Sequence, residues 1–265
     1  MRQFLLILVS LLLCSSATAA PGPLLAVFAH PDDESATIGP LLSRYAIEVH
    51  DFYLIVVTSG QVGDSNTDIP RGDELGAVRE KEARCSCKAL GIHEPFLLQF
   101  MDGSIADWET IPKIRERVRK IIEEVKPEVI ITWGPDGLTG HPDHRTVSSL
   151  TTEIFQQRSK LTHRPSKLYY VAYPESSFAN LPPGMAQYAE RIGLVADEWV
   201  TTVVDASAYQ DQAWNSIQCH KTQWPPQMMA MIRSLGSELL GGKVYLRLAL
   251  QGSKAPGEKE QSIFD

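Results

Sequence analysis

The stretch AVFAHPDDES, residues 26–35, changes abruptly from apolar side chains to a histidine, a proline and three consecutive acids. Its first half is a short, continuous apolar run, which is typical of a strand covered on both faces. Pro and Asp directly after the run are favoured at the start of a helix, Pro by its fixed φ and Asp by the helix dipole. A buried strand that leads straight into a helix predicts the first unit of an α/β domain.

Similar apolar runs recur along the chain, and helical patterns separate them. The strand-like runs are residues 24–30, 53–60, 95–100, 128–134, 167–173 and 199–205. The helical patterns are residues 35–46, 72–91, 111–125 and 144–158. This order predicts a single three-layer, doubly wound α/β domain whose sheet is largely parallel and Rossmann-like. Gly91 is expected to end the second helix.

The two ends of the chain differ from this pattern. Residues 1–20 contain one positive charge at Arg2, an apolar run over 4–13 and the small residues Ala17-Thr18-Ala19. That order is typical of a secretory signal peptide, and the run is too short to span a bilayer. We therefore expect an exported protein, periplasmic or secreted, without a membrane span in its mature chain. The catalytic domain is expected over residues 21–250, and a polar, flexible tail over 251–265.

Charge and cysteine content narrow the possible partners. A net charge of −7 makes nucleic acid and anionic membranes poor candidate partners. Beyond the expected signal peptide the chain has Cys85, Cys87 and Cys219. Cys85 and Cys87 lie two apart on one predicted helix, where side chains do not face each other, so a bridge between them is not expected. An odd count leaves at least one thiol free or paired with another chain, and we interpret the cysteines as small buried side chains.

The stretch GHPDHR, residues 140–145, repeats the His-Pro-Asp core of the opening motif. Either motif alone is explained by a helix start, because Pro and Asp suit the first helical turn. Two such motifs with three histidines favour a site, because a helix cap does not require histidine. Both motifs follow predicted strands of a parallel sheet, and sites in such sheets form beyond the carboxyl ends of the strands. We expect the motifs to share one crevice.

The residue types in this crevice suit a divalent metal ion. A catalytic zinc ion has three protein ligands from His and carboxylate groups, keeps a position open for water and activates that water. His30 and Asp33 are close enough in sequence to reach one ion, and one histidine of the second motif would complete the set. Asp32 then remains to accept a proton from water, and the other histidine can polarise the substrate oxygen or protonate the leaving group.

AHPDDE followed by GHPDHR resembles the LmbE/PIG-L family, which comprises zinc-dependent N-deacetylases of N-acetylglucosamine conjugates and related amides. Weaker similarities to motifs of this family lie in TSGQVGD (58–64), VREKEARCSCKALGI (78–92), MDGS (101–104) and AWNSIQCHKTQ (213–223). Together the segments cover roughly residues 24–225. The paired histidine motifs are specific, whereas each of the other segments is a weak signal alone.

The resemblance implies a role for each matching residue. One Zn²⁺ per chain would be held by His30, Asp33 and His144, and Fe²⁺ suits the same ligands. Asp32 would be the general base, His141 the oxyanion stabiliser or general acid, and Asp143 would tune His141. Arg79 and Asp102 would contact substrate. Two residues depart from the pattern of many members: Gln61 replaces a Glu, and Thr139 stands where some carry a Tyr.

The leading hypothesis is an exported, zinc-dependent amidohydrolase that removes an acetyl group from an N-acetylated sugar or glycoconjugate. One alternative is a phosphoesterase, which usually carries two metal ions. Another is a non-catalytic, metal-stabilised glycan-binding protein. Several other residues have ordinary structural interpretations: Arg79 with Glu82 as a surface ion pair, His220 with Gln223 as a core or helix-surface pair, Glu34 as a first-turn acid, and Trp108 and Trp133 as core or sugar-stacking residues.

Overall fold

Seven strands form the central sheet of the protein, for which a computed structural model describes residues 22–48, 51–179, 181, 190–252 and 262–263. The strands are β1 (Leu24–Phe28), β2 (Phe52–Thr58), β3 (Phe96–Phe100), β4 (Val129–Thr132), β5 (Lys167–Val171), β8 (Thr202–Asp205) and β9 (Lys243–Gln251). Their order is β3-β2-β1-β4-β5-β9-β8. A separate two-stranded pair joins β6 (Tyr173–Pro174) to β7 (Leu194–Val195). The predicted signal peptide, residues 1–20, lies outside the described residues.

The sheet confirms the predicted doubly wound α/β fold. Strands β1 to β5 are parallel. Strands β2 and β3 lie on one side of β1, and β4 and β5 lie on the other, so the winding of the sheet reverses between β1 and β4. All five residues of β1 are buried, as its continuous apolar run predicts. Strand β9 was not predicted and runs antiparallel to both β5 and β8. Its buried Val244, Leu246 and Leu248 alternate with half-buried residues, so it lacks the continuous apolar run on which the prediction relied.

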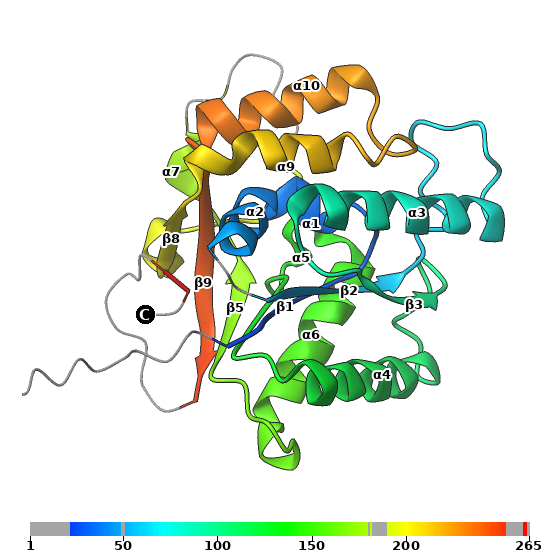
Figure 1. Ribbon diagram of the computed structural model, residues 1–265, viewed down its shortest axis with the longest axis vertical. Coiled ribbons are helices and arrows are strands. Elements are labelled where there is room, and N and C mark those ends of the chain that lie inside the picture. Colours follow the sequence, from blue (N-terminus) through cyan, green and yellow to red (C-terminus); the bar gives the residue numbers. More distant parts are fainter. Residues whose placement is uncertain (1–21, 49–50, 180, 182–189, 253–261, 264–265) are drawn as a thin grey trace, which may run out of the picture.

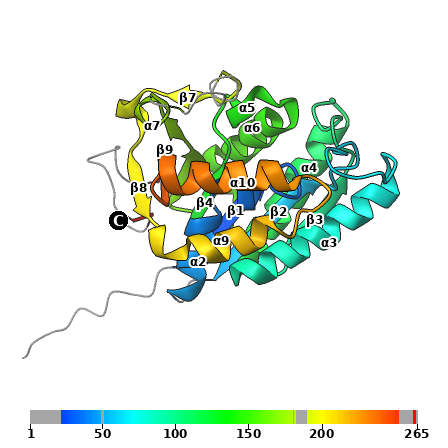
Figure 2. The same ribbon diagram turned by 90° about the horizontal axis from the view of Figure 1, so that it is seen from above.

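Helices cover both faces of the sheet (Figure 1). One face carries α1 (Asp33–Thr37), α2 (Gly39–Ile47), α3 (Asp73–Leu90), α9 (Gln210–Ile217) and α10 (Pro226–Ser234). The other carries α4 (Thr110–Val125) and α6 (Pro142–Gln156). Shorter helices are α5 (Gly137–Gly140) and α7 (Glu175–Phe178), with 3₁₀ turns at Arg158–Lys160, Asp197–Trp199 and Ser207–Tyr209 and a π turn at Leu235–Leu239. Seen from above, α9 and α10 cross over the parallel strands (Figure 2).

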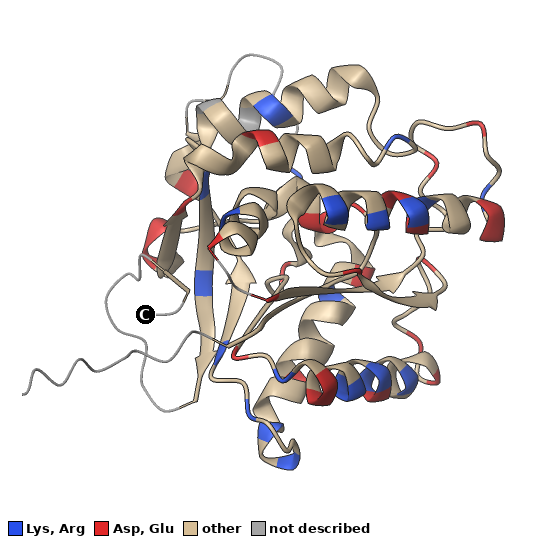
Figure 3. Ribbon diagram, in the orientation of Figure 1, with Lys and Arg blue, Asp and Glu red and all other residues tan. Residues whose placement is uncertain are grey.

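Local sequence explains where these helices begin, end and face. The single helix predicted over 35–46 is divided at Ile38, because Pro40 begins a new helix rather than continuing the first. Gly91 ends α3 in the left-handed conformation, φ 77°, as predicted. The buried residues of α4 form one apolar stripe, Ile114, Val118, Ile121 and Ile122. Basic and acidic residues are intermixed along the outer faces of α3 and α4 (Figure 3).

Two further observations concern the predicted tail and the membrane. Ile263 is fully buried and its backbone N–H lies 3.3 Å from the Tyr45 hydroxyl, so this part of the predicted flexible segment belongs to the core. Ser262 also contacts the Tyr45 hydroxyl, and at the other end of the predicted tail Gln251 belongs to strand β9. Among the helices of the described residues, none combines the length and apolar character that crossing a bilayer requires.

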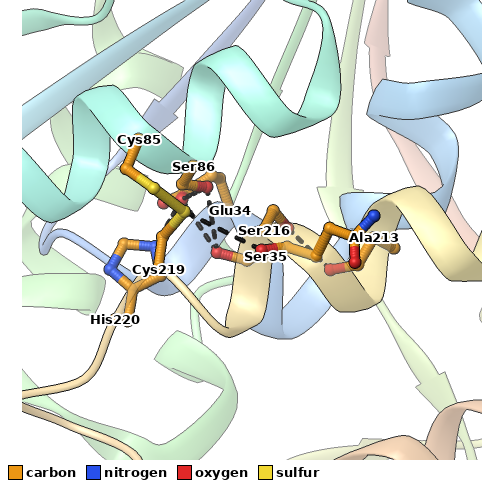
Figure 4. The surroundings of a disulfide bond; sticks show 9 residues. Glu34, Ser35, Cys85, Ser86, Ala213, Ser216, Cys219 and His220 are labelled. Carbon is orange, nitrogen blue, oxygen red and sulfur yellow. Dashed lines mark hydrogen bonds and ion pairs between the residues drawn. A yellow bond between two sulfur atoms is a disulfide. The ribbon is translucent and has the colours of Figure 1, made fainter.

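A disulfide joins Cys85 on α3 to Cys219 just after α9 (Figure 4). The interpretation of these two residues as buried thiols was therefore wrong, because helices distant in sequence bring them together. Cys87, two residues after Cys85 on α3, is a free and buried thiol, as predicted. The bridge fastens α9 and the segment after it to α3, on the same face of the sheet as α1.

Replacing both bridged cysteines, Cys85→Ser with Cys219→Ser, is expected to lower the free energy of unfolding by about 2–4 kcal/mol. The bridge closes a loop of 134 residues and so restricts the unfolded chain. Denaturant unfolding of wild type and double variant, each with and without a reducing agent, measures the effect. The reductant should shift the wild type only; an equal shift in both proteins would contradict the assignment.

Candidate active site

The two histidine motifs meet where the winding of the sheet reverses. His30 follows β1, and His141 and His144 begin α6 beyond β4. Strands β1 and β4 are adjacent and parallel, with Leu24 opposite Val129, so their carboxyl ends lie side by side. Ligands of open α/β sheets bind at this kind of position. The predicted crevice is confirmed as a meeting point of the two motifs.

Three potential metal-ligating side chains converge there. His30 Nδ1 lies 3.1 Å from His144 Nε2, and His144 Nε2 lies 3.3 Å from Asp33 Oδ1. His30 Nδ1 is 3.7 Å from the other oxygen of Asp33. Ligand atoms about 2.0–2.1 Å from a tetrahedral zinc ion lie roughly 3.3 Å from one another. Both distances from His144 Nε2 therefore match the spacing of zinc ligands, whereas His30 Nδ1 and Asp33 lie somewhat farther apart.

Hydrogen bonds on the opposite ring nitrogens orient both imidazoles toward this point. His144 Nδ1 lies 2.9 Å from the carbonyl oxygen of Gly137 and donates to it. His30 Nε2 lies 3.1 Å from Asp102 Oδ1 and 3.4 Å from Asp143 Oδ2. A ring nitrogen that donates to oxygen leaves the other nitrogen with a lone pair for a metal. The donor set thus fits a divalent cation in tautomer as well as in spacing.

The carboxylates around His30 give the site a negative character. Burial lowers the pKa of His30, but hydrogen bonds to Asp102 and Asp143 and the charge of Asp33 outweigh it and raise the pKa to about 10. Burial raises the pKa of Asp33, but His144 and His30 together hold it well below its usual range. Backbone N–H groups of Ala29 and His30 also donate to Asp33. Three buried carboxylates beside two imidazoles favour a bound cation.

The carboxylates of Asp102 and Asp143 both contact His30. Asp102 was expected to contact substrate; it lines the cavity, but one oxygen lies against His30 and the other accepts from the Val62 N–H. Asp143 was expected to tune His141, and its backbone N–H does contact that ring, while its carboxylate contacts His30 and the Gly103 N–H. The reason is that Asp143 lies in the first turn of α6 and faces inward, toward the end of β1.

His141 is the third imidazole of the cluster. Its ring lies 4.7 Å from that of His30 and 5.1 Å from that of His144, and one nitrogen of each of these three rings could contact a common ion. We favour Asp33 over His141 as third ligand, because Asp33 supplies charge and its oxygen is 3.3 Å from His144 Nε2. The Asp143 N–H donates to His141 Nδ1, which leaves a proton on Nε2 in the neutral ring. Burial, then the two neighbouring imidazoles, lower the pKa of His141.

Asp32 lies beside the proposed ligands with its carboxylate 3.4 Å from the Arg79 guanidinium. Burial raises its pKa to about 6, although Arg79 opposes that shift. Arg79 is itself buried and donates to the carbonyl oxygens of Gly60 and Pro31. The predicted surface pair of Arg79 with Glu82 was wrong: both are buried, and Glu82 accepts from Thr222 instead.

Other residues named from the sequence have structural positions around the site. The Gln61 amide bridges the Phe100 carbonyl and the Asp102 N–H, which supports the turn carrying Asp102. Thr139 lines the cavity. The buried Trp133 ring stacks on His144, 4.3 Å between centroids, whereas Trp108 is 89% exposed. Sequence reasoning gave no role to the carbonyl of Gly137, since backbone groups leave no residue-type signal.

A cavity of about 1310 Å³ opens from these residues. At one end it is lined by the ligand triad, Asp32, His141 and Arg79. It continues along α9, α10 and the turn that follows, where its lining is largely apolar: Trp214, Ile217, Met228, Met231, Ile232 and Leu240. The volume exceeds the roughly 300–1,000 Å³ of common small-molecule pockets. The site therefore has room for a ligand larger than one sugar ring.

Known proteins are similar to this chain over most of its length. A family model described as PIG-L, GlcNAc-PI de-N-acetylase, matches residues 25–155. A 1D-myo-inositol 2-acetamido-2-deoxy-alpha-D-glucopyranoside deacetylase of Mycobacteroides abscessus is 30% identical over 228 residues, which cover 76% of this chain and 81% of the relative. The chain belongs to the PIG-L family. The family model spans both histidine motifs, and the resemblance inferred from them is confirmed.

Solved structures extend the likeness of this PIG-L member to its fold. N,N'-diacetylchitobiose deacetylase from Pyrococcus horikoshii matches with a TM-score of 0.66 and 17% identity, covering 85% of this chain and 83% of that one. GalB, the 4-carboxy-2-hydroxymuconate hydratase from Pseudomonas putida, matches with a TM-score of 0.64 and 14% identity, covering 88% and 98%. The same fold thus carries a deacetylase and a hydratase, so the reaction must be argued from the site.

Proposed function

We propose that this protein is a metal-dependent hydrolase that removes the acetyl group from an N-acetylated sugar conjugate. The observation that carries the proposal is the triad of His30, Asp33 and His144 with Asp32 and His141 at its edge. The deacetylase relative with 30% identity supports the same reaction class. Zinc is the proposed ion, because two imidazoles and one carboxylate leave an open fourth position.

Asp32 and His141 would act beside the bound cation in this reaction. When bound, a divalent cation supplies Lewis acidity toward a carbonyl oxygen and lowers the pKa of water beside it. Asp32 accepts the proton of the attacking water, and its raised pKa of about 6 suits a base near neutrality. His141, with its proton on Nε2, donates a hydrogen bond to the developing oxyanion. Asp32 then returns the proton to the departing nitrogen, so that acetate and a free amine result.

The cavity supports a conjugate rather than a free monosaccharide as substrate. Its polar end, at the triad, would take the N-acetyl sugar. The apolar lining from α9 and α10 would contact the group attached to that sugar. Burying an apolar aglycone against it stabilises the complex by roughly 25 cal/mol per Å² before the costs of association. The attached group should therefore improve binding.

An acetate-release screen of the metal-loaded protein tests this function. It should include free N-acetylglucosamine, the same sugar with polar and with apolar aglycones, and small acetamides. We expect release from the sugars and a lower KM for those with apolar aglycones. Absence of acetate from every N-acetyl sugar, with metal bound, would contradict the proposal. One ion per chain agrees with the deacetylase, whereas two ions with phosphate-ester cleavage would indicate the phosphoesterase alternative.

We also propose that the protein is exported with removal of residues 1–20. The bridge between Cys85 and Cys219 supports this, because disulfides persist in oxidising compartments and are rare in the cytosol. The N-terminal mass of the chain, purified from its native cells, tests the proposal. A mature chain beginning near Pro21 is expected, and an intact N-terminus in the cytosol would contradict it.

A further inference from the structure

Glu34 and His220 form a fully buried pair of ionisable side chains beside the disulfide (Figure 4), and Glu34 contacts the backbone of Asp32. Glu34 Oε1 lies 3.0 Å from His220 Nε2, and both side chains are 0% exposed. Neither residue lines the cavity, so neither can touch a substrate. Carboxylates are almost never buried this completely unless they are paired. The pair therefore requires an explanation other than contact with the reacting groups.

The two oxygens of Glu34 serve different purposes. Oε1 accepts from Ser35 at 2.8 Å, from Ser86 at 2.5 Å and from His220. Oε2 accepts from the backbone N–H of Asp32 at 3.2 Å. Three donors thus immobilise one end of the carboxylate, and the other end reaches the proposed general base. Because His220 holds Glu34 in place, it acts on Asp32 through Glu34.

The peptide group between Pro31 and Asp32 is held at both of its ends. The carbonyl oxygen of Pro31 accepts from Arg79 Nη2 at 2.6 Å, and the N–H of Asp32 is bound to Glu34. The two atoms belong to one planar unit, so the contacts fix the orientation of that plane, and helix α1 holds the backbone on the other side of Asp32. Asp32 has a φ of 120°, which is rare for a residue other than glycine. Such a conformation persists only when its surroundings impose it.

We infer that Glu34 and His220 form a positioning pair that imposes the backbone conformation of Asp32 and so directs its carboxylate into the site. This inference rests on the proposed function in taking Asp32 as the base. The segment that carries His220 is anchored on both sides. Cys219 is bridged to Cys85, next to Ser86, and Thr222 donates to Glu82. The bridge at the adjacent Cys219 places the imidazole against Glu34, although 186 positions separate the two residues.

Three variants separate positioning from a merely structural role. The double variant Glu34→Met with His220→Leu replaces the pair by apolar side chains, an exchange that often preserves stability. It removes the acceptor for the Asp32 N–H, and we expect kcat to fall roughly 100-fold, because a displacement of about 1 Å has that effect. Metal stoichiometry and KM should stay near wild type. Glu34→Gln keeps an oxygen acceptor and should retain kcat within roughly 10-fold.

Glu82→Ala is the matched control. Glu82 is a buried acid that holds the same segment but does not contact Asp32. This variant should lower the melting temperature and leave kcat unchanged, since the disulfide still fastens Cys219. A kcat that falls equally in Glu82→Ala and in the double variant would show that general loosening of the segment is responsible, and would overturn the inference.

Crystal structures of wild type, Glu34→Gln and the double variant provide a readout without activity. Asp32 should keep its positive φ in Glu34→Gln and leave it in the double variant. An unchanged Asp32 in the double variant overturns the inference even if kcat falls. Conversely, a wild type that deacetylates nothing refutes the proposed function, while the conformation of Asp32 still decides the role of Glu34 and His220.

Discussion

Asp32→Asn is expected to abolish most turnover and to leave the metal bound. Loss of a positioned general base lowers kcat by roughly 10²–10⁴-fold. The metal should remain, because the Asp32 carboxylate faces Arg79 at 3.4 Å and lies outside the His30–Asp33–His144 triad. Asparagine tolerates positive φ, so the substitution removes charge without a new backbone strain. Steady-state acetate release and metal analysis of the purified variant measure both effects.

The control for this variant is Asp51→Asn, at the start of β2 and the opposite edge of the sheet, where Asp51 pairs with the exposed His93. It should behave as wild type.

The wild type should also lose kcat/KM as the pH falls through the pKa of Asp32, because a protonated base cannot accept a proton. Burial raises that pKa to about 6 against the opposing charge of Arg79, and a bound cation shifts it back toward lower pH. Normal turnover by Asp32→Asn would refute its role as the base.

His144→Ala is expected to lose the metal itself. The substitution removes the nitrogen that lies within 3.1 Å of His30 Nδ1 and 3.3 Å of Asp33. Removing a mere hydrogen-bonding partner of a ligand lowers metal affinity 10–100-fold, so loss of a ligand should exceed roughly 100-fold. Metal competition against a chelator gives the affinity. The melting temperature should cease to depend on added metal, because a ligand stabilises only the state that binds it.

His141→Ala serves as the comparison and decides between the two available ligand sets. His141 lies in the same cluster, but its Nδ1 accepts from the Asp143 N–H, and we place it at the oxyanion. It should keep the metal and lose kcat. If His141→Ala loses the metal while Asp33→Ala keeps it, the three histidines are the ligands, and the assignment of Asp33 is wrong.

Much of the site was predictable because its residues follow strands of a parallel sheet. The continuous apolar run of β1 and the run of β4 predict buried neighbours; the first histidine motif follows β1 directly, and the second follows β4 after a short loop and α5. A parallel sheet brings such strand ends to one edge. Strand β9 was not predicted by this reasoning, because half-buried residues separate its buried Val244, Leu246 and Leu248. The contacts of Asp102 and Asp143 with His30 also escaped it, since side-chain direction depends on the turn that carries each residue.

The fold class, the ends of several helices and the meeting of the two histidine motifs could be predicted from residue patterns alone. These follow from periodicity, from Pro and Gly positions, and from the geometry of parallel strands. Only the tertiary structure decided the bridge from Cys85 to Cys219, the orientation of His144 by the Gly137 carbonyl, and the pairing of Glu34 with His220. The disulfide and the Glu34–His220 pair each join residues far apart in sequence. The Gly137 carbonyl is a backbone group, which residue types do not reveal. The packing of helices against the sheet sets all three, and local sequence does not encode it.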